Sequence, residues 1–393
     1  MRTRLMLLAL ILVVPVPGWG QGVTVGTPDG ALQLDLTAVI DIEGYDVSAP
    51  PPGLVFGDGG RSINPRLTIF SGARIGERAF AFVQLRADRG FDPLQVERDV
   101  RADAYYLRLA LVKDGRLNVV VGKSATLVGN WVTRHYSWDN PFVNAPLPYE
   151  NVTIIWDRWA PSSPAEFLGY LRQPDRKADM LPMIWGPVYA TGLSASGSTG
   201  PWDYGVEVKN AGLSSRPADW PAGATGWRRP TVSGRAGFRP TAAWNIGVSV
   251  SKGHYLTGDP DRTLLAGARL SDFHQTTVGQ DLAYAHGHLQ LWSEVFWTRF
   301  EVQRVGTVTT SAYYVEGKYK LTPQLFLAAR WGQQSFSEVN GTPWDGPASR
   351  AEVAIGYRFG RRLQVKAQYG RTTEDRPVAQ GQRLAAIQIT LRL

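Results

Sequence analysis

The sequence predicts an all-β protein: a transmembrane antiparallel β-barrel of 16–18 strands, with short periplasmic turns, long extracellular loops and one loop folded into the lumen. Three observations lead to this fold class. Apolar and polar residues alternate along segments of about 9–11 residues, the length of a tilted strand that crosses a bilayer. Short connections alternate with long polar ones, and aromatic residues gather near segment ends, as in outer-membrane barrels.

The N-terminus carries the features of a secreted protein. Arg2 and Arg4 precede an apolar run over 5–14, and Pro15, Pro17 and a Gly-Trp-Gly stretch follow it. A charged start, a short apolar run and small residues before a cleavage point are typical of a signal peptide. We therefore expect residues 1–20 to be a signal peptide and 21–393 to be a single outer-membrane β-barrel domain. The lack of Cys excludes a lipidated N-terminal Cys and a disulfide scaffold.

The C-terminal segment RLAAIQITLRL shows the alternation. Ile387 and Ile389 fall on one face, and Gln388 and Thr390 on the other, because successive side chains of a strand point to opposite sides. A soluble sandwich would alternate too, so strand length, loop lengths and the aromatic residues decide for the membrane barrel. The same pattern recurs at 204–209, 244–251, 351–358 and 363–369.

The connections divide into two kinds. RPTAA, AHGH, LTPQ and GRR are tight, whereas 253–274, 335–348 and 373–382 are open and polar. Candidate strands number 18, beginning at 31–40 and ending at 383–393, and they number 16 without the weakest pair, which lies within 152–173. Both counts are even and large enough to leave an aqueous channel.

The charges are scattered along the chain and do not gather on one face, as they do in a nucleic-acid binder. The chain has 42 Lys and Arg, two of them within 1–20, and 34 Asp and Glu, so residues 21–393 carry +6. On the predicted register the polar face looks into the lumen. The pore-wall candidates are Arg66, Arg74, Arg86, Arg108, Arg235, Lys318, Arg330 and Arg358, with Lys209, Lys320, Arg350, Lys366 and Arg392 beside them. The inward acids are Asp35, Asp88, Asp203, Glu207, Asp281, Glu294, Glu316 and Glu352.

This excess of inward bases predicts an anion preference, since basic rings favour anions and acidic rings favour cations. The alternative is that the charges pair across strands and only keep the lumen wet.

The segment 124–150, which we call the insert, does not alternate. It is rich in aromatic residues that need cover, and its prolines cannot donate to a strand ladder. We expect it to fold into the lumen and narrow the pore; the alternatives are a cap over the barrel mouth and a contact with a neighbouring subunit. The expected pore-constriction and solute-binding residues are Lys123, Trp131, Arg134, Tyr136, Trp138 and Asp139.

The stretch VGKSATLVGNWVTRHYSWDNPFVNAPLPYE (121–150) resembles the phosphate-selective porin O and P family. In that family a strand ending G-K/R-F leads to P-F-G and D-N-P, and Gly122-Lys123 and Asp139-Asn140-Pro141 match this pattern. The resemblance implies a trimeric outer-membrane channel with an inward loop. The phosphate-specific members carry a dense run of Lys and Arg along the constriction, whereas this insert offers Lys123 and Arg134. The chain also ends in Leu393, where most such barrels end in Phe.

We therefore expect a porin of the Gram-negative outer membrane, which forms a water-filled channel for passive diffusion of small hydrophilic solutes, with anions preferred. Its partners are those solutes, outer-membrane lipid and two further copies in a homotrimer, and no nucleic acid or cofactor. The alternatives are an outer-membrane barrel enzyme, a hydrolase or acyltransferase, and a plugged structural barrel. No catalytic motif occurs, and we expect no metal at His286 and His288, which flank a tight turn.

Overall fold

A computed structural model describes residues 22–48, 60–94, 97–224, 227, 230–257, 264–376 and 381–393. The expected signal peptide, 1–20, lies outside these residues. Within them no helix is long and apolar enough to span a membrane.

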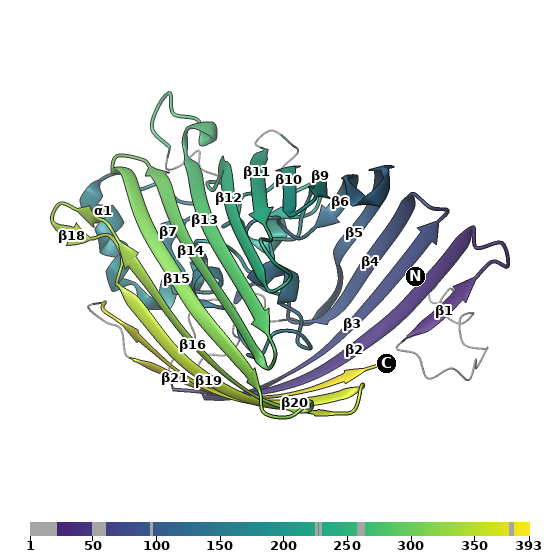
Figure 1. The fold of residues 1–393 in the computed structure, drawn as a ribbon. Helices are drawn as coiled ribbons and strands as arrows, with labels where there is room; N and C mark the ends of the chain where they lie inside the picture. Colours follow the sequence, from purple (N-terminus) through teal and green to yellow (C-terminus); the bar gives the residue numbers. More distant parts are fainter. Residues whose placement is uncertain are drawn as a thin grey trace, which may run out of the picture.

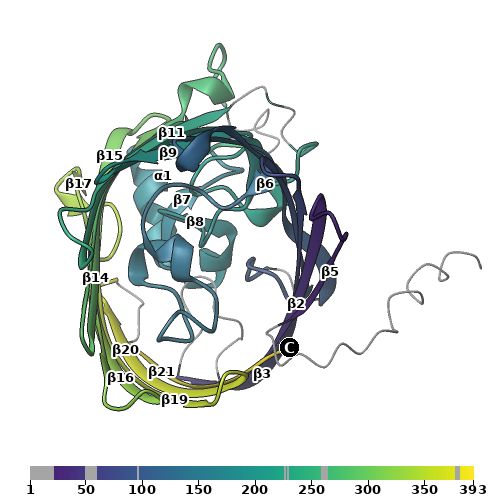
Figure 2. The ribbon, with the colours of Figure 1, turned by 45° about the vertical axis from the view of Figure 1, so that its right-hand side comes forward.

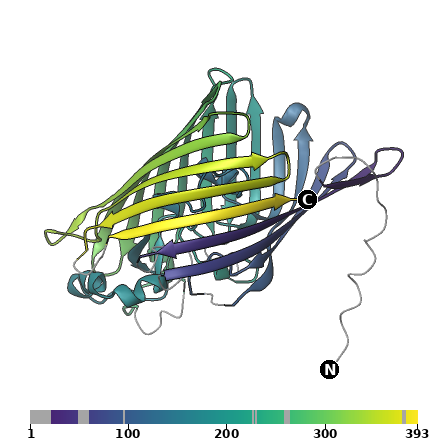
Figure 3. The same cartoon turned by 90° about the horizontal axis from the view of Figure 1, so that it is seen from below.

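Sixteen antiparallel strands form one closed barrel in the described part of the chain (Figure 1). The last strand pairs with the first long one, β2, so the sheet has no open edge, and the short β1 (Val23–Gly26) pairs with part of β2. In Figure 3 the yellow C-terminal strands lie beside the purple N-terminal ones at this seam. The wall strands are β2 (Leu32–Val47), β3 (Gly60–Ile75), β4 (Ala79–Asp88), β5 (Asp99–Val112), β6 (Leu117–Ser124), β9 (Ala190–Thr199), β10 (Trp202–Lys209), β11 (Thr231–Phe238), β12 (Trp244–His254), β13 (His274–His286), β14 (Leu289–Val302), β15 (Gly306–Lys320), β16 (Leu325–Phe336), β19 (Ala348–Phe359), β20 (Leu363–Glu374) and β21 (Gln382–Arg392).

The predicted fold class is confirmed, at the lower strand count. The pair proposed within 152–173 is not part of the wall. Instead β7 (Val152–Trp156) pairs with β8 (Met180–Pro182), and α1 (Pro164–Gly169) lies between them in sequence. Figure 2 shows β7, β8 and α1 inside the ring of wall strands. The apolar run of β7 is buried against other interior residues, so it has the composition of a strand without facing lipid.

The alternation places polar side chains inside and apolar ones outside, as predicted. On β19, Val353 is 56% exposed while its neighbour Glu352 is 4% exposed. On β21, Ile389 is 41% exposed and Gln388 1%. An exposed apolar band around a polar interior is the arrangement that lipid requires of a barrel.

The two rims differ in the length of their connections. At one rim the turns are short: 76–78, 200–201, 287–288 and 360–362. Gly287 adopts a positive φ of 55° there, which an L side chain seldom adopts. At the other rim the longest connection, 125–189, turns into the barrel. We call it the lumen loop; it begins with the insert and continues through β7, α1 and β8.

The buried core lies within the barrel, between the wall and the lumen loop. It includes Tyr149, Ile154, Leu181 and Trp185 of the loop packed with wall residues such as Phe296. The remaining short elements are η1 (Lys113–Gly115), η2 (Trp131–Arg134), η3 (Leu147–Tyr149), η4 (Tyr170–Arg172), η5 (Pro174–Asp179), η6 (Pro217–Asp219), η8 (Leu270–Asp272), β17 (Glu338–Val339) and β18 (Thr342–Pro343).

Candidate functional site

The insert is fastened to the wall first by two buried glutamates. Glu207 on β10 accepts hydrogen bonds from the Thr126 hydroxyl at 2.6 Å and from the Leu127 backbone N–H at 3.2 Å. Glu294 on β14 accepts from the Tyr149 hydroxyl at 2.9 Å and from the backbone N–H groups of Asn130 and Trp131. Each carboxylate thereby satisfies loop donors that would otherwise be buried without a partner, which is costly.

Arginines continue these attachments on β15, β16 and β19. Arg134 of the insert donates to Glu316 at 2.5 Å. Arg330 on β16 donates to the side-chain oxygen of Asn144 at 2.7 Å, and it also pairs with its wall neighbour Glu352 at 2.6 Å. Arg350 on β19 donates to Glu150 of the insert at 2.8 Å. Charge-assisted bonds of this kind are short and strong, so they hold the insert against one side of the barrel.

The ammonium group of Lys366 on β20 binds three backbone carbonyls of the insert. Its Nζ lies 2.8 Å from Ser137 O, 2.8 Å from Asn140 O and 3.1 Å from Phe142 O. These three bonds use every donor of the ammonium. Lys366 thus supplies three of the bonds that hold the turn at 137–142 to the wall, and Gln364 and Arg358 add one each, to the carbonyls of Ser137 and Trp138.

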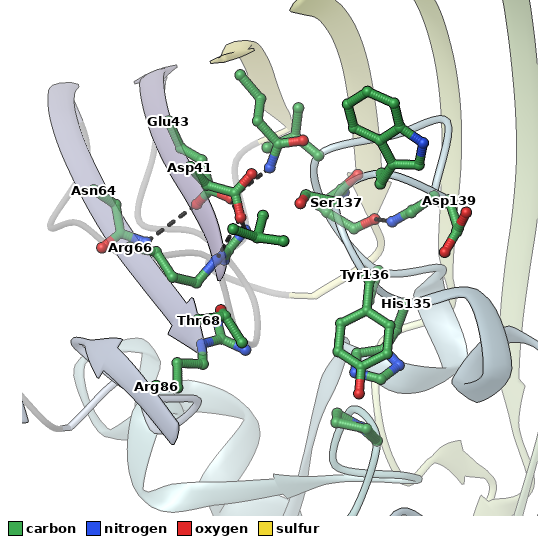
Figure 4. A pocket seen from close by; sticks show the side chains of 18 of the residues that line it. Asp41, Glu43, Asn64, Arg66, Thr68, Arg86, His135, Tyr136, Ser137 and Asp139 are labelled. Carbon is green, nitrogen blue, oxygen red and sulfur yellow. Dashed lines mark hydrogen bonds and ion pairs between the residues drawn. The ribbon is translucent and has the colours of Figure 1, made fainter. Parts of the chain in front are cut away.

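A cavity of about 370 Å³ remains between the insert and strands β2–β4. Figure 4 shows Asp41, Glu43 and Arg66 on the wall side and Tyr136 and Asp139 on the insert side. One side of the cavity is thus charged and the other largely aromatic.

Two of the wall arginines of this cavity, Arg66 and Arg86, are paired with acids. Arg66 lies 3.0 Å from Asp41 and 2.5 Å from Glu43. These acids also accept hydrogen bonds across the barrel seam: Thr390 donates to Asp41 and Gln388 donates to Glu43, each at 2.6 Å. Next to this cluster, Arg86 pairs with Asp88 at 2.6 Å, and Arg101 bridges Asp88 and Asp103.

A second cavity, of about 740 Å³, lies nearer the long-loop rim. Lys123 lines it, and its ammonium group donates to the backbone carbonyl of Ala102 at 2.8 Å. Arg216 also lines it and pairs with Asp157 at 3.0 Å. The two cavities occupy different levels of the lumen, and each carries charges of both signs.

At the short-turn end of the insert, the guanidinium groups of two arginines lie near the ring of Trp138. The Cζ atoms of Arg358 and Arg392 are 4.8 Å and 5.0 Å from the centre of its ring. Lys318 packs over Phe326 nearby, and the exposed carboxylate of Asp139 interacts electrostatically with both Arg358 and Lys318. Two of these three cations, Arg358 and Lys318, thus share one nearby acid of the insert.

The predicted constriction residues divide into three groups. Trp131, Tyr136, Trp138 and Asp139 line the inner cavity. Lys123 lines the outer one instead, and Arg134 turns its guanidinium toward the wall, where it binds Glu316 and the Tyr314 hydroxyl. These two bases, the ones that the resemblance singled out, do not meet at one narrow point.

The predicted wall residues are also spread over several levels. Arg66 and Arg86 line the inner cavity. Arg330 is buried beneath the insert, and Arg235 is paired with Asp203 and Asp281, each at 2.7 Å. Arg74 and Arg108 are exposed, and Arg108 packs over Phe80 at 5.0 Å.

Sequence reasoning missed three wall acids, Asp41, Glu43 and Asp103. The signal for the first two was present: they continue the polar face that begins at Asp35, but the strand was ended at residue 40, whereas β2 runs to Val47. In the described ranges no group of three His, Asp or Glu side chains could hold a metal ion.

These features define an outer-membrane channel barrel: a closed 16-stranded sheet, apolar outside, with a polar interior narrowed by a wall-bound loop. Residues 223–345 match the family model described as phosphate-selective porin O and P, which confirms the predicted resemblance. No curated protein sequence matches the chain.

Solved structures with the same fold cover nearly the whole chain. They include the anion-selective porin from Comamonas acidovorans, with 10% identity, 92% of this chain and 100% of that chain covered and a TM-score of 0.56. The trimer form of OmpT, an outer-membrane protein of Vibrio cholerae, has 11% identity, 92% and 100% coverage and a TM-score of 0.57. The outer-membrane channel DcaP of Acinetobacter baumannii has 10% identity, 94% and 99% coverage and a TM-score of 0.58.

Proposed function

We propose that this protein is a passive porin: a water-filled outer-membrane channel through which small hydrophilic solutes diffuse, with anions preferred. The observation that carries the proposal is the open space beside the insert. The lumen loop binds β10, β14, β15, β16, β19 and β20, yet a cavity lined by charged and polar side chains remains along β2–β4. A barrel whose loop left no such space would support a plugged structural role.

The anion preference rests on the basic side chains that form no ion pair with an acidic side chain. Six of the thirteen predicted inward bases form ion pairs, as the alternative reading of the charges expects: Arg66, Arg86, Lys209, Arg235, Arg330 and Arg350. Around Trp138, however, Lys318, Arg358 and Arg392 form no ion pair among the described residues. These three cations outnumber the one acid beside them, Asp139. An excess of positive charge beside a narrow passage lowers the energy of an anion there and raises that of a cation.

The geometry favours a channel over an enzyme. His135 is the imidazole that lines the inner cavity, and its two ring nitrogens contact Val132 O at 2.5 Å and the Tyr189 hydroxyl at 2.7 Å. A general base must reach the proton of a nucleophile, and both nitrogens of this ring already have structural partners. We also propose a homotrimer, which the family resemblance and the trimer form of one similar structure support.

Planar-bilayer recordings test the proposal. The purified protein should give stepwise, ohmic channels with a reversal potential that favours Cl⁻ over K⁺ in a KCl gradient. Deleting 130–145 should raise the single-channel conductance, because the bonds to Lys366 and Arg330 go while the wall ladders stay. A silent protein would contradict the channel function, and a reversal potential that favours K⁺ would contradict the anion preference.

A further inference from the structure

We propose that Trp138, Arg358 and Arg392 form a recognition site for small organic monoanions that carry an aromatic ring, of the chemical class of benzoate. Trp138 and Arg392 line the inner cavity at its short-turn end, and Arg358 contacts the Trp138 ring from outside that lining. This inference rests on the proposed channel function and names the solute class that the channel selects.

The two arginines have donors left for a ligand. Arg358 donates its Nε to Gln364 at 2.7 Å and one Nη to the carbonyl of Trp138 at 2.8 Å. A guanidinium has five N–H donors, so three remain. Arg392 faces the Trp138 ring, and in the described part of the chain neither arginine forms an ion pair. A carboxylate fits such donors in a bidentate arrangement.

The rest of the cavity supplies apolar and aromatic surface. Trp138, Trp131 and Phe142 contribute from the insert. Phe70 of β3 meets Tyr136 edge to face, with ring centres 5.3 Å apart. A ligand ring gains from aromatic packing of this kind, and the cavity volume of about 370 Å³ falls within the usual range for small-molecule sites.

Inorganic phosphate suits the same place poorly. It would have to exchange its hydration for many charged donors, and the next arginines along the cavity are already occupied: Arg66 by Asp41 and Glu43, and Arg86 by Asp88. Asp139 is exposed at the site and interacts with Arg358, so its negative charge opposes a second charge on the ligand. A monoanion with an aromatic ring keeps both favourable interactions: its carboxylate binds the arginines, and its ring packs against the aromatic side chains.

The test is block of the KCl current by added anions in planar bilayers. We expect sodium benzoate to reduce the current at concentrations at least tenfold below those at which sodium phosphate or acetate does. Trp138→Leu and Arg392→Gln should each weaken benzoate block at least tenfold, whereas Trp138→Phe should retain most of it. Arg383→Gln, on the outward face of β21, is the matched charge control and should leave block unchanged.

The outcomes separate this inference from the channel function. If the protein forms open channels and benzoate blocks no better than phosphate or acetate, the recognition site is wrong while the porin proposal stands. If the protein is silent, both fail. If Trp138→Leu gives no channels, Arg392→Gln still tests the site, because no side-chain hydrogen bond of Arg392 holds the insert in the described structure. Unchanged benzoate block in Arg392→Gln overturns the site.

Discussion

Replacing Lys366 with methionine removes the ammonium group from three insert carbonyls while keeping most of the side-chain volume. One hydrogen bond to a charged group contributes about 1.5–3 kcal/mol. Methionine also avoids the cost of burying an ammonium, and the freed carbonyls of Ser137, Asn140 and Phe142 border the cavity, where water can reach them. We therefore count one bond net, about 1.5–3 kcal/mol, which raises the population of the loosened turn about 10- to 150-fold.

Two measurements report on this loosening. Open-channel current noise should increase in Lys366→Met, and hydrogen exchange of the amides at 137–142 should accelerate, with the barrel ladders unchanged. Lys320→Met removes an exposed charge from the same rim of the barrel, without a bond to the insert in the described structure, and is the control. Equal noise and exchange in Lys366→Met and Lys320→Met would refute the role assigned to the three carbonyl bonds.

Three further perturbations probe the membrane face, the charged cavity wall and the packing of the insert. Val353→Arg places a charge on the lipid face and should lower the free energy of unfolding by about 2–4 kcal/mol near the midplane, measured by urea titration of folding into vesicles. Val353→Leu is the control, and an equal effect of both substitutions would contradict the strand register. Arg66→Met leaves Asp41 and Glu43 without their cation and should shift the reversal potential toward cation preference. The shift should be smaller at about 1 M salt, where the Debye length is about 3 Å. An unchanged reversal potential would place these acids outside the ion path. Burial lowers the pKa of His135 to about 4, below its ordinary value of about 6.5. The folded insert therefore binds this proton less readily than the unfolded chain does. It loses stability as the pH falls from about 6.5 to about 4. Current noise should therefore rise over that window, and the rise should be absent in His135→Gln; an unchanged rise in that variant would exclude the imidazole as its source.

The barrel could be predicted because lipid and water impose a period of two on every wall strand. Several ion pairs were within reach as well: Asp41 stands opposite Arg66, and Glu352 opposite Arg330, in the strand register. They require only the register, which strand ends and turn lengths fix. Ending β2 at residue 40 hid the first of them, and with it part of the charge balance of the pore.

The lumen loop was less predictable for a physical reason. Its polar groups form hydrogen bonds with one another and with the wall, such as Arg134 with Glu316 or Lys366 with the carbonyls at 137–142. These contacts do not recur at a regular spacing in the sequence. The apolar stretch at 152–156 faces a protein interior instead of lipid, and composition alone does not distinguish the two surroundings. The aromatic residues and prolines of the insert indicated that it leaves the wall, but not which wall strands bind it.

The seam between β2 and β21 also ties channel chemistry to assembly. Asp41 and Glu43 receive bonds from Thr390 and Gln388 only when the first and last wall strands have met. Replacing Thr390 or Gln388 would remove one of these donors while the wall ladders stay, and the carboxylate left behind would face the pore with less of its charge screened. A mutation at the seam can therefore alter permeation without touching the insert.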